Sequence, residues 1–188
     1  MLAAGLSSRL GAFKPALRIQ GACLIERAIA PFTELCDHII VVTGHRREWV
    51  DEIVQRHQKV TTVYNENYHL GMFSSVKKGL SLLSGERFFL TPGDFPFLKS
   101  STLEDMLSCD SDIVVPRHHG EKGHPVLMKS SLAKDILSDD ASPSLREWMR
   151  HKSVSYVDTE DDGVLFDIDT HADYIAAERL ICRTAEAP

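Results

Sequence analysis

HIIVVTGHRREWVDEIVQRHQKVTTVY, residues 38–64, holds two short apolar runs separated by an amphipathic segment. Both runs, 38–43 and 60–64, are rich in β-branched residues, which is typical of strands. Between them Trp49, Ile53 and His57 recur at every fourth position, the spacing of one face of a helix. A strand, a helix and a second strand in this order predict two parallel strands joined by a helical crossover.

The same alternation continues along most of the chain. Further strands are predicted at 87–91, 112–115, 125–128, 153–157 and 164–166, and helices at 24–35, 74–83, 101–109, 145–151 and from 170 to about 183. The segment Ser101-Thr102-Leu103-Glu104 has the form of a capping box, and Ser142 before Pro143 has the form of a helix N-cap. The alternation predicts one α/β domain, residues 1–188, whose largely parallel sheet is covered by helices on both faces.

The composition argues against several classes of protein. The 188 residues carry a net charge of -6, with a pI near 5.8, which does not favour a broad electrostatic grip on nucleic acid or on an acidic membrane surface. No apolar run approaches the ~20 residues that a transmembrane helix needs. The four cysteines are widely spaced, which is not the pattern of a disulfide framework and favours a cytoplasmic protein.

Ligands of open α/β sheets bind where strands end, and the first loop of this chain is unusual. Residues 2–14, LAAGLSSRLGAFK, combine small residues, two glycines and the cations Arg9 and Lys14. Gly5 and Gly11 allow backbone conformations in which successive N–H groups face an anion. The pattern suits a nucleoside triphosphate, although it is neither a Walker A loop nor a Gly-x-Gly-x-x-Gly loop. A surface loop with two solvated cations is an equally good interpretation of the composition alone.

Acidic residues follow two other apolar runs. Asp94 comes shortly after one predicted strand, and Asp167 and Asp169 come directly after another. Carboxylates from two strand ends can share one Mg²⁺ ion, which also binds substrate phosphates. Taken singly, Asp94 is more simply explained as a turn residue and Thr170 as a helix cap.

Two further loops carry polar residues that could serve a ligand. Asn65 and the segment Gly71-Met72-Phe73-Ser74-Ser75 can present N–H and hydroxyl groups to an anion, or they can simply cap a helix. His118, His119 and His124 lie close together in the sequence, so a metal site has to be considered. Without cysteine ligands or a zinc-type spacing, a solvated loop is the favoured interpretation.

Taken in order, these motifs resemble the MobA-like nucleotidyltransferase family, and within it the molybdenum cofactor cytidylyltransferases. The motifs are Leu2 to Lys14, Asn65, Gly71 to Ser75, Gly93 to Pro96, Gly123-His124-Pro125, and Asp167 to Thr170 with the later Asp173. The resemblance covers almost the whole chain. It implies a three-layer α/β/α, Rossmann-like fold of the nucleotide-diphospho-sugar transferase type, with a mostly parallel mixed sheet.

The resemblance also implies a role for each motif. The residues implied in nucleotide binding are Leu2, Ala3, Ala4, Gly5, Ser8, Arg9, Gly11, Lys14, Asn65 and Ser75. Arg9 and Lys14 would hold the triphosphate and, with Asp94, form the catalytic set. Asp94 would bind Mg²⁺ together with Asp169 or Asp167. His124 would face the acceptor.

The implied reaction is transfer of CMP from CTP to a phosphorylated acceptor, with release of pyrophosphate. A molybdopterin-type molybdenum cofactor is the favoured acceptor, and a molybdenum hydroxylase is a possible partner. Guanylyl transfer, a sugar- or alcohol-phosphate acceptor, and a non-catalytic cofactor-binding module remain as alternatives.

The chain departs from the family pattern in two places. Several apolar residues precede Leu-Ala-Ala-Gly in the family, whereas only Met1 precedes Leu2 here, so we expect either a short first strand or a start that lies upstream. Many cytidylyltransferases carry a Gly-Asp-x-Gly-Ala-Arg-like segment after the position of Asp140, where this chain has ASPSLR, ending at Arg146. Nucleotide binding is therefore a firmer expectation than the identity of the acceptor.

Overall fold

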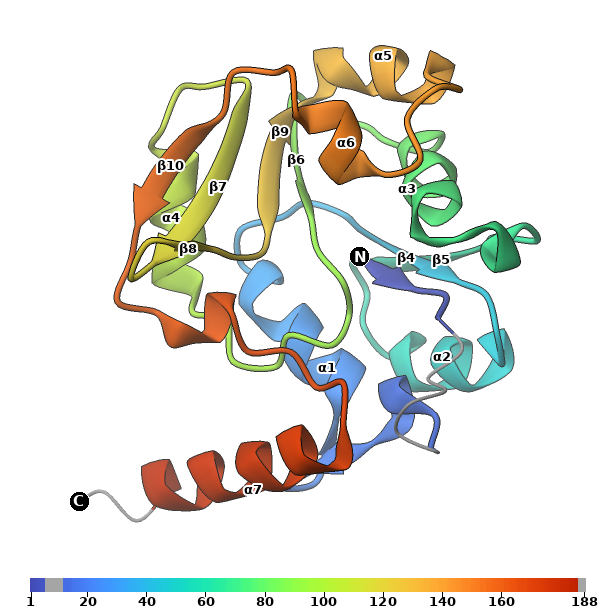
Figure 1. Cartoon of the computed structure of the whole chain (residues 1–188). Helices are drawn as coiled ribbons and strands as arrows, with labels where there is room; N and C mark the ends of the chain where they lie inside the picture. Colours follow the sequence, from blue (N-terminus) through green and yellow to red (C-terminus); the bar gives the residue numbers. More distant parts are fainter. Residues whose placement is uncertain (6–11, 186–188) are drawn as a thin grey trace.

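Two sheets meet at the N-terminal strand in the computed structural model, which describes residues 1–5 and 12–185 (Figure 1). The first sheet is parallel and has the order β1 (Leu2–Ala3), β4 (Ile39–Thr43), β5 (Val60–Tyr64). The second has the order β10 (Ser155–Asp158), β7 (Ile113–His118), β9 (Val126–Lys129), β6 (Arg87–Leu90), with β8 (Glu121–Lys122) beside β7. A parallel bridge between Leu2 and Pro92 joins the two sheets.

The second sheet is mixed, so the predicted parallel arrangement holds for only part of it. β10 runs parallel to β7, but β9 runs antiparallel to both β6 and β7. The chain leaves β7 through a tight hairpin into β8 and returns at once along β9. A connection this short has no room for a helical crossover, so it produces antiparallel neighbours.

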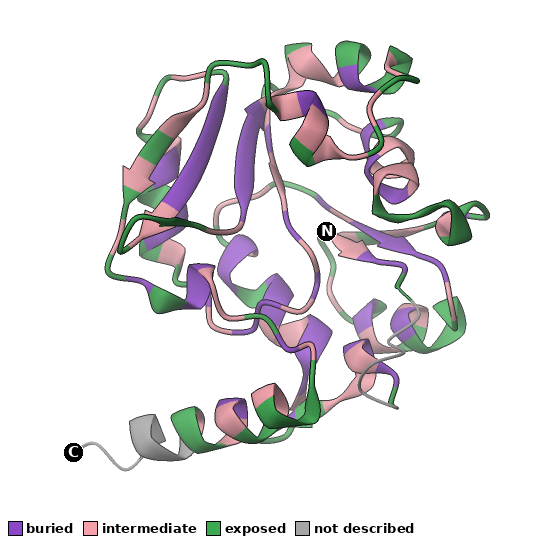
Figure 2. Ribbon diagram, in the orientation of Figure 1, coloured by how far each residue is buried: buried purple, intermediate pink, exposed green. Residues whose placement is uncertain are grey.

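Helices cover both faces of the sheets, as the sequence predicts for a three-layer α/β/α fold. One face carries α1 (Leu24–Ile29), α2 (Arg47–Val54) and α4 (Ser100–Leu107), and the other carries α3 (Met72–Leu80), α5 (Ala133–Ser138) and α6 (Leu145–Met149). Neighbouring strand residues face opposite layers: Phe88 packs towards α3 and α6, whereas Phe89 packs towards η2 (Ala30–Phe32) and α4. Figure 2 shows β7, β9 and α1 as largely buried.

The last helix, α7 (His171–Ala185), packs outside the sheets against the hairpin of β2 (Arg18–Ile19) and β3 (Ala22–Cys23). Its N-terminus is closed by two side chains. The Thr170 hydroxyl accepts the Asp173 N–H, and the Asp173 carboxylate accepts the N–H groups of Asp169 and Thr170. The prediction that Thr170 is a helix cap is confirmed. Among the described residues, no helix is both long and apolar enough to cross a bilayer.

The predicted strand at 164–166 is wrong, because this segment contains the 3₁₀ turn η5 (Asp162–Val164). Its apolar residues fill the core: Val164 is fully buried, and the Phe166 ring packs edge-on against Phe97. The turn is set by the buried Asp161, whose carboxylate accepts the N–H groups of Gly163 and of Lys99. A run of three apolar residues does not by itself distinguish a strand from an irregular segment whose side chains are buried in the core.

Two predicted helix caps are also corrected. α4 begins at Ser100, with Lys99 at its N-cap, so the predicted cap Ser101 lies inside the helix, and no side-chain hydrogen bond caps its start. α6 is capped by Ser144, whose hydroxyl accepts the Glu147 N–H at 3.2 Å, and not by Ser142. The Ser142 hydroxyl donates instead to the Asp139 carboxylate, at 2.7 Å.

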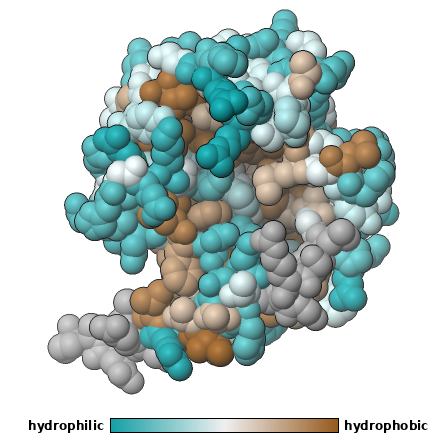
Figure 3. Space-filling model, viewed as in Figure 1, coloured by the Kyte–Doolittle hydropathy of each residue, from teal (hydrophilic) through white to brown (hydrophobic). Residues whose placement is uncertain are grey.

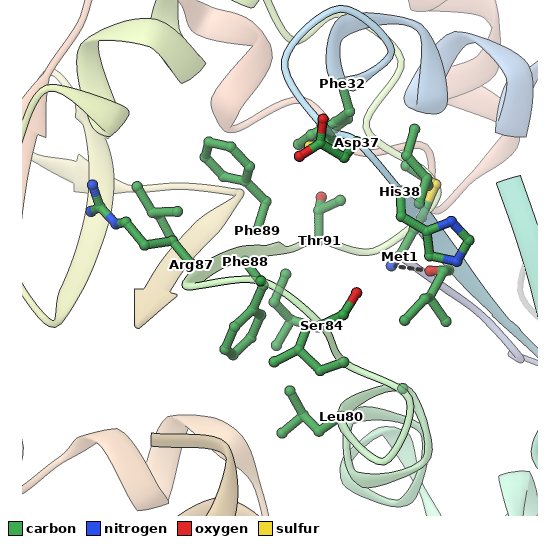
Figure 4. Close-up of a pocket in the computed structure, with 18 of the residues that line it drawn as sticks. Met1, Phe32, Asp37, His38, Leu80, Ser84, Arg87, Phe88, Phe89 and Thr91 are labelled. Atoms are coloured by element: carbon green, nitrogen blue, oxygen red, sulfur yellow. Dashed lines mark hydrogen bonds between the residues drawn. The ribbon is translucent and has the colours of Figure 1, made fainter. Parts of the chain in front are cut away.

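A cavity of about 370 Å³ opens between β4 and β6, beside Met1 (Figure 4). Figure 4 shows Phe88 and Leu80 on one wall and Phe32 and His38 on another. The Met1 amine donates to the Ile40 carbonyl, at 2.8 Å, in extension of the β1–β4 ladder. The two sheets therefore contact each other through the backbone near the carboxyl end of β6. Towards the start of β6, the cavity lies between them.

Leu2 makes the contact between the sheets, so a proline at this position should weaken the fold. The Leu2 N–H donates to the Thr91 carbonyl at 2.9 Å, and the Leu2 carbonyl accepts the Gly93 N–H at 2.9 Å. Leu2→Pro removes the donor and leaves Thr91 without it. We expect the free energy of unfolding to fall by about 1–3 kcal/mol, measured by urea unfolding followed by circular dichroism.

Leu2→Met is the matched control, because it keeps the N–H and nearly the same side-chain volume. It should cost less than about 1.5 kcal/mol. A Leu2→Pro protein as stable as Leu2→Met would contradict the joining role of this strand.

Candidate active site

A second cavity, of about 430 Å³, opens at the carboxyl ends of β1 and β6. It is bordered by the first loop, by η1 (Lys14–Ala16), by η3 (Tyr68–Leu70) with the start of α3, and by two acidic loops. Its lining includes Leu2, Ala3, Ala4, Gly5, Lys14, Tyr68, Gly71, Met72, Ser75, Gly93, Asp94 and Asp169. Figure 3 shows hydrophobic surface gathered in the middle of this face, around the place where Figure 1 marks the N-terminus.

Three carboxylates and one lysine meet at the side of this cavity. Ligand oxygens of Asp94, Asp167 and Asp169 all lie within 4.8 Å of one another. Lys14 Nζ donates to Asp94 Oδ2 at 3.1 Å and also to Asp169 Oδ1. Asp94 Oδ1 is buried and has no hydrogen-bond partner among the described residues. A cluster of hard oxygen ligands with an unsatisfied buried oxygen fits a divalent cation such as Mg²⁺.

One hydrogen bond in the backbone brings the two acidic loops together. The Ile168 N–H donates to the Asp94 carbonyl at 3.1 Å, and the Ile168 side chain is fully buried against α7 and β2. Because Ile168 is fixed in the core, its neighbours Asp167 and Asp169 are held close to Asp94. The Asp-Ile-Asp sequence therefore places two carboxylates beside a third from another loop.

Lys14 and Asp167 both have shifted pKa values. Burial alone would lower the pKa of Lys14, but its hydrogen bonds and its attraction to Asp169 and Asp94 outweigh burial and raise it. Burial raises the pKa of Asp167, and the negative charges of Asp94 and Asp169 raise it further. The cluster thus holds more negative charge than one lysine balances, which favours a bound cation.

His124 lies next to this cluster, behind Phe95. Its ring centroid is 5.0 Å from that of Phe95, and its Nδ1 is buried without a hydrogen-bond partner in the described part of the chain. Burial lowers the pKa of His124, although the charge of Asp94 opposes this shift. Gly123 keeps the loop close to η5, because a Cβ there would lie 2.3 Å from the Val164 carbonyl oxygen. Burial therefore favours the neutral imidazole of His124. His124 does not belong to the cluster that His118 and His119 form.

Asn65 and Ser75 shape the cavity wall in different ways. The buried Asn65 amide donates to the hydroxyls of Ser74 and Ser75, at 2.9 Å each, and accepts the Asn67 N–H at 3.0 Å. These bonds tie the end of β5 to the start of α3. Ser75 lines the cavity, whereas Asn65 lies behind it. Ser8, Arg9 and Gly11 lie outside the described residues, so their predicted roles stay predictions.

Gly44 and Tyr68 also lie at this site, although they belong to none of the sequence motifs. A Cβ on Gly44 would lie 2.7 Å from both the Ala4 carbonyl oxygen and the Tyr68 Cβ. Only glycine lets the loop after β4 pass between the first loop and η3 at this distance. For Gly44, the sequence did contain a signal, because this glycine directly follows the predicted strand 38–43, and ligand-binding loops begin where strands end.

A family model matches most of the chain. The MobA-like NTP transferase domain matches residues 1–157. This chain belongs to the MobA-like NTP transferases. The match begins before the first loop and includes Asp94 and His124, and it ends before Asp167.

One curated relative agrees with this family, and solved structures share the fold. The molybdenum cofactor cytidylyltransferase of Escherichia coli (strain K12) is 30% identical over 177 residues, which are 94% of this chain and 92% of that protein. A nucleotidyl transferase from Methanothermobacter thermautotroptrophicus has a TM-score of 0.83 at 22% identity, covering 97% and 96% of the two chains. A Mycobacterium tuberculosis H37Rv protein solved in complex with manganese has a TM-score of 0.76 at 19% identity, covering 95% of each chain.

In this MobA-like transferase, Lys14 should compete with a metal ion for the carboxylates. Replacing Lys14 by methionine removes the ammonium that pairs with Asp94 and Asp169. Without nucleotide, we expect Lys14→Met to bind Mn²⁺ about 3–10-fold more tightly than the wild type, because one repulsive positive charge is lost. Isothermal titration calorimetry measures this affinity. Lys129→Met, at an exposed ion pair, is the control, and an unchanged or weaker affinity in Lys14→Met would refute the competition.

Asp167 should oppose folding at neutral pH. Its folded pKa is raised, so its contribution to stability is fully present below the unfolded pKa and is lost as the pH rises through the folded pKa. Ionised Asp167 therefore destabilises the metal-free protein at pH 7. We expect Asp167→Asn to raise the thermal midpoint by up to about 2 °C at pH 7, and the gain to vanish below about pH 4.

Asp110→Asn is the control for this measurement, because the Asp110 side chain is 94% exposed. It should leave the midpoint within about 1 °C at both pH values. A midpoint of Asp167→Asn that is equal to or below that of the wild type at pH 7 would show that the carboxylate is not under repulsion.

Proposed function

We propose that this MobA-like transferase moves CMP from CTP to a phosphorylated, molybdopterin-type acceptor and releases pyrophosphate, with Mg²⁺ as its metal ion. The observation that carries the proposal is the position of the Asp94–Asp167–Asp169 cluster and Lys14 at the side of the cavity that the first loop borders. The cytidyl substrate and the acceptor are supported by the similarity to the E. coli molybdenum cofactor cytidylyltransferase.

The reaction needs no covalent intermediate on the protein. A phosphate oxygen of the acceptor attacks the α-phosphorus of CTP in line, and the bond to the pyrophosphate oxygen breaks as the new P–O bond forms. Such transfers depend on positioning and on stabilisation of negative charge at the phosphates. The chain offers both, because a backbone loop and a cation border the same cavity as the carboxylates.

Each part of the cavity has its own task in this mechanism. The backbone of Leu2 to Gly5 lies where β1 ends and would bind the nucleotide. Lys14 would transfer its hydrogen bonds from Asp94 and Asp169 to phosphate oxygens and so balance charge on the departing pyrophosphate. Held by Asp94 and by Asp169 or Asp167, Mg²⁺ would supply further positive charge at the phosphates. Arg9 is proposed to assist Lys14.

His124 is proposed to face the acceptor. Because burial keeps its imidazole neutral, it can hydrogen-bond a polar acceptor group without adding charge to the site. Its unpartnered Nδ1 is a buried polar atom that a ligand could satisfy. A molybdenum hydroxylase as the recipient of the product is a further part of this proposal.

The test is pyrophosphate release from CTP, GTP, UTP and ATP, each with Mg²⁺ and a molybdopterin-type acceptor. We expect release with CTP and the acceptor together. Release with GTP would move the protein to guanylyl transfer. A Mg²⁺-dependent rise of the thermal midpoint with a nucleotide, but no release, would indicate a binding module that does not catalyse.

The metal assignment is tested by Asp94→Asn. The change keeps the shape of the Asp94 side chain but removes the negative charge with which it is proposed to hold the metal ion. We expect kcat to fall at least about 100-fold with the fold intact by circular dichroism. Asp110→Asn should retain full activity. Undiminished release by Asp94→Asn in Mg²⁺ buffer would overturn the metal assignment.

A further inference from the structure

The turn between β7 and β8 carries two adjacent histidines that the proposed function does not use. Ligand atoms of His118, His119 and Glu160 all lie within 4.8 Å of one another. His118 ends β7, His119 lies in the turn, and Glu160 follows β10. Figure 1 shows this hairpin on the opposite side of the molecule from β4 and β5. The cluster shares no residue with the Asp94–Asp167–Asp169 cluster.

The backbone is held firmly on both sides of these three residues. β7 and β10 are parallel neighbours, and the Arg117 guanidinium donates to both carboxylate oxygens of Asp158, at 2.6 and 2.9 Å. The Thr159 N–H donates to the Arg117 carbonyl at 3.0 Å. His119 and Gly120 both have positive φ, 47° and 85°, as a two-residue hairpin turn requires. The ends of β7 and β10 therefore present His118, His119 and Glu160 at one place.

A backbone carbonyl sets the tautomer of His118. Its Nδ1 lies 2.9 Å from the Thr159 carbonyl oxygen, which can only accept a hydrogen bond, so Nδ1 carries the proton. In the neutral ring the lone pair is then on Nε2. Histidines that bind metal ions are commonly oriented in this way, with the other ring nitrogen donating to a carbonyl. The His119 ring lies beside that of His118, with centroids 4.1 Å apart.

The donor set indicates the class of ion. Two imidazole nitrogens and one carboxylate oxygen suit a borderline ion such as Zn²⁺, whereas Mg²⁺ and Ca²⁺ prefer oxygen ligands alone. Three protein ligands leave a coordination position for water, which fits a site where His119 and Glu160 are exposed. We propose that His118, His119 and Glu160 bind one transition-metal ion of the zinc class at the β7–β8 hairpin.

Binding would cross-link the hairpin to the segment that follows β10. An ion that binds only the folded chain raises its stability by mass action. With Mg²⁺ in excess to occupy the Asp94–Asp167–Asp169 cluster, we therefore expect Zn²⁺ to bind with a stoichiometry of one and to raise the thermal midpoint of the full chain. Co²⁺, which takes similar ligands, should give a visible absorption band whose intensity reports its coordination.

The variants are His118→Ala, His119→Asn and Glu160→Gln, in the full chain. Asparagine is chosen at position 119 because it tolerates positive φ. We expect each variant to weaken Zn²⁺ binding at least about tenfold, by calorimetry, and to lose the Co²⁺ band. His151→Ala, which removes another exposed histidine, and the double variant Asp94→Asn/Asp169→Asn should bind as the wild type does.

Wild-type affinity in both histidine variants would overturn the site. Loss of binding in Asp94→Asn/Asp169→Asn, but not in the histidine variants, would place the ion at the other cluster and also overturn it. Wild-type affinity in Glu160→Gln would remove Glu160 as the third ligand. The outcome is independent of nucleotidyl transfer, because neither the ion titration nor the Co²⁺ spectrum requires a nucleotide.

Discussion

The backbone hydrogen bonds of Leu2 are the constraint on which the rest of the structure depends. One edge of β1 pairs with β4, and the other reaches the chain just beyond β6 through the Thr91 carbonyl and the Gly93 N–H. The two sheets are joined at this point. As a result, the loop that leaves β1 lies directly beside the loop that carries Asp94, and the loop proposed to bind the nucleotide shares a cavity with the carboxylates.

The carboxylates themselves are brought together against their mutual repulsion. Ile168 is buried and bonded to the Asp94 carbonyl, so Asp167 and Asp169 have to approach Asp94. Lys14 offsets part of the repulsion, but burial, together with the charges of Asp94 and Asp169, still raises the pKa of Asp167. This arrangement costs stability in the metal-free protein, and it suits the proposed binding of a cation and phosphates.

The sequence predicted most of the strands and, at the candidate site, that carboxylates from two separate loops would come together. β4, β5, β6, β7, β9 and β10 all lie at predicted positions to within three residues at their ends, because β-branched runs bounded by turn residues are a local signal. It failed at 164–166, where apolar residues fill the core without forming a strand. The sequence also gave no sign that the Asn65 amide would donate hydrogen bonds to Ser74 and Ser75 instead of lining the cavity. Those bonds depend on how β5 and α3 approach each other in the fold.

The histidines separate what the chain determines by itself from what its folding adds. His118, His119 and His124 are neighbours in sequence, yet His124 is half-buried beside Phe95 and Asp94, while the other two meet Glu160 from beyond β10. The sequence determined most of the strands and helices, because secondary structure follows from short-range sterics and periodicity. It also fixed which side chains stand after each strand. Only the tertiary structure decided which of them meet, as when Lys14 pairs with Asp169 across 155 positions of the chain, because strand order and burial act between residues far apart in sequence.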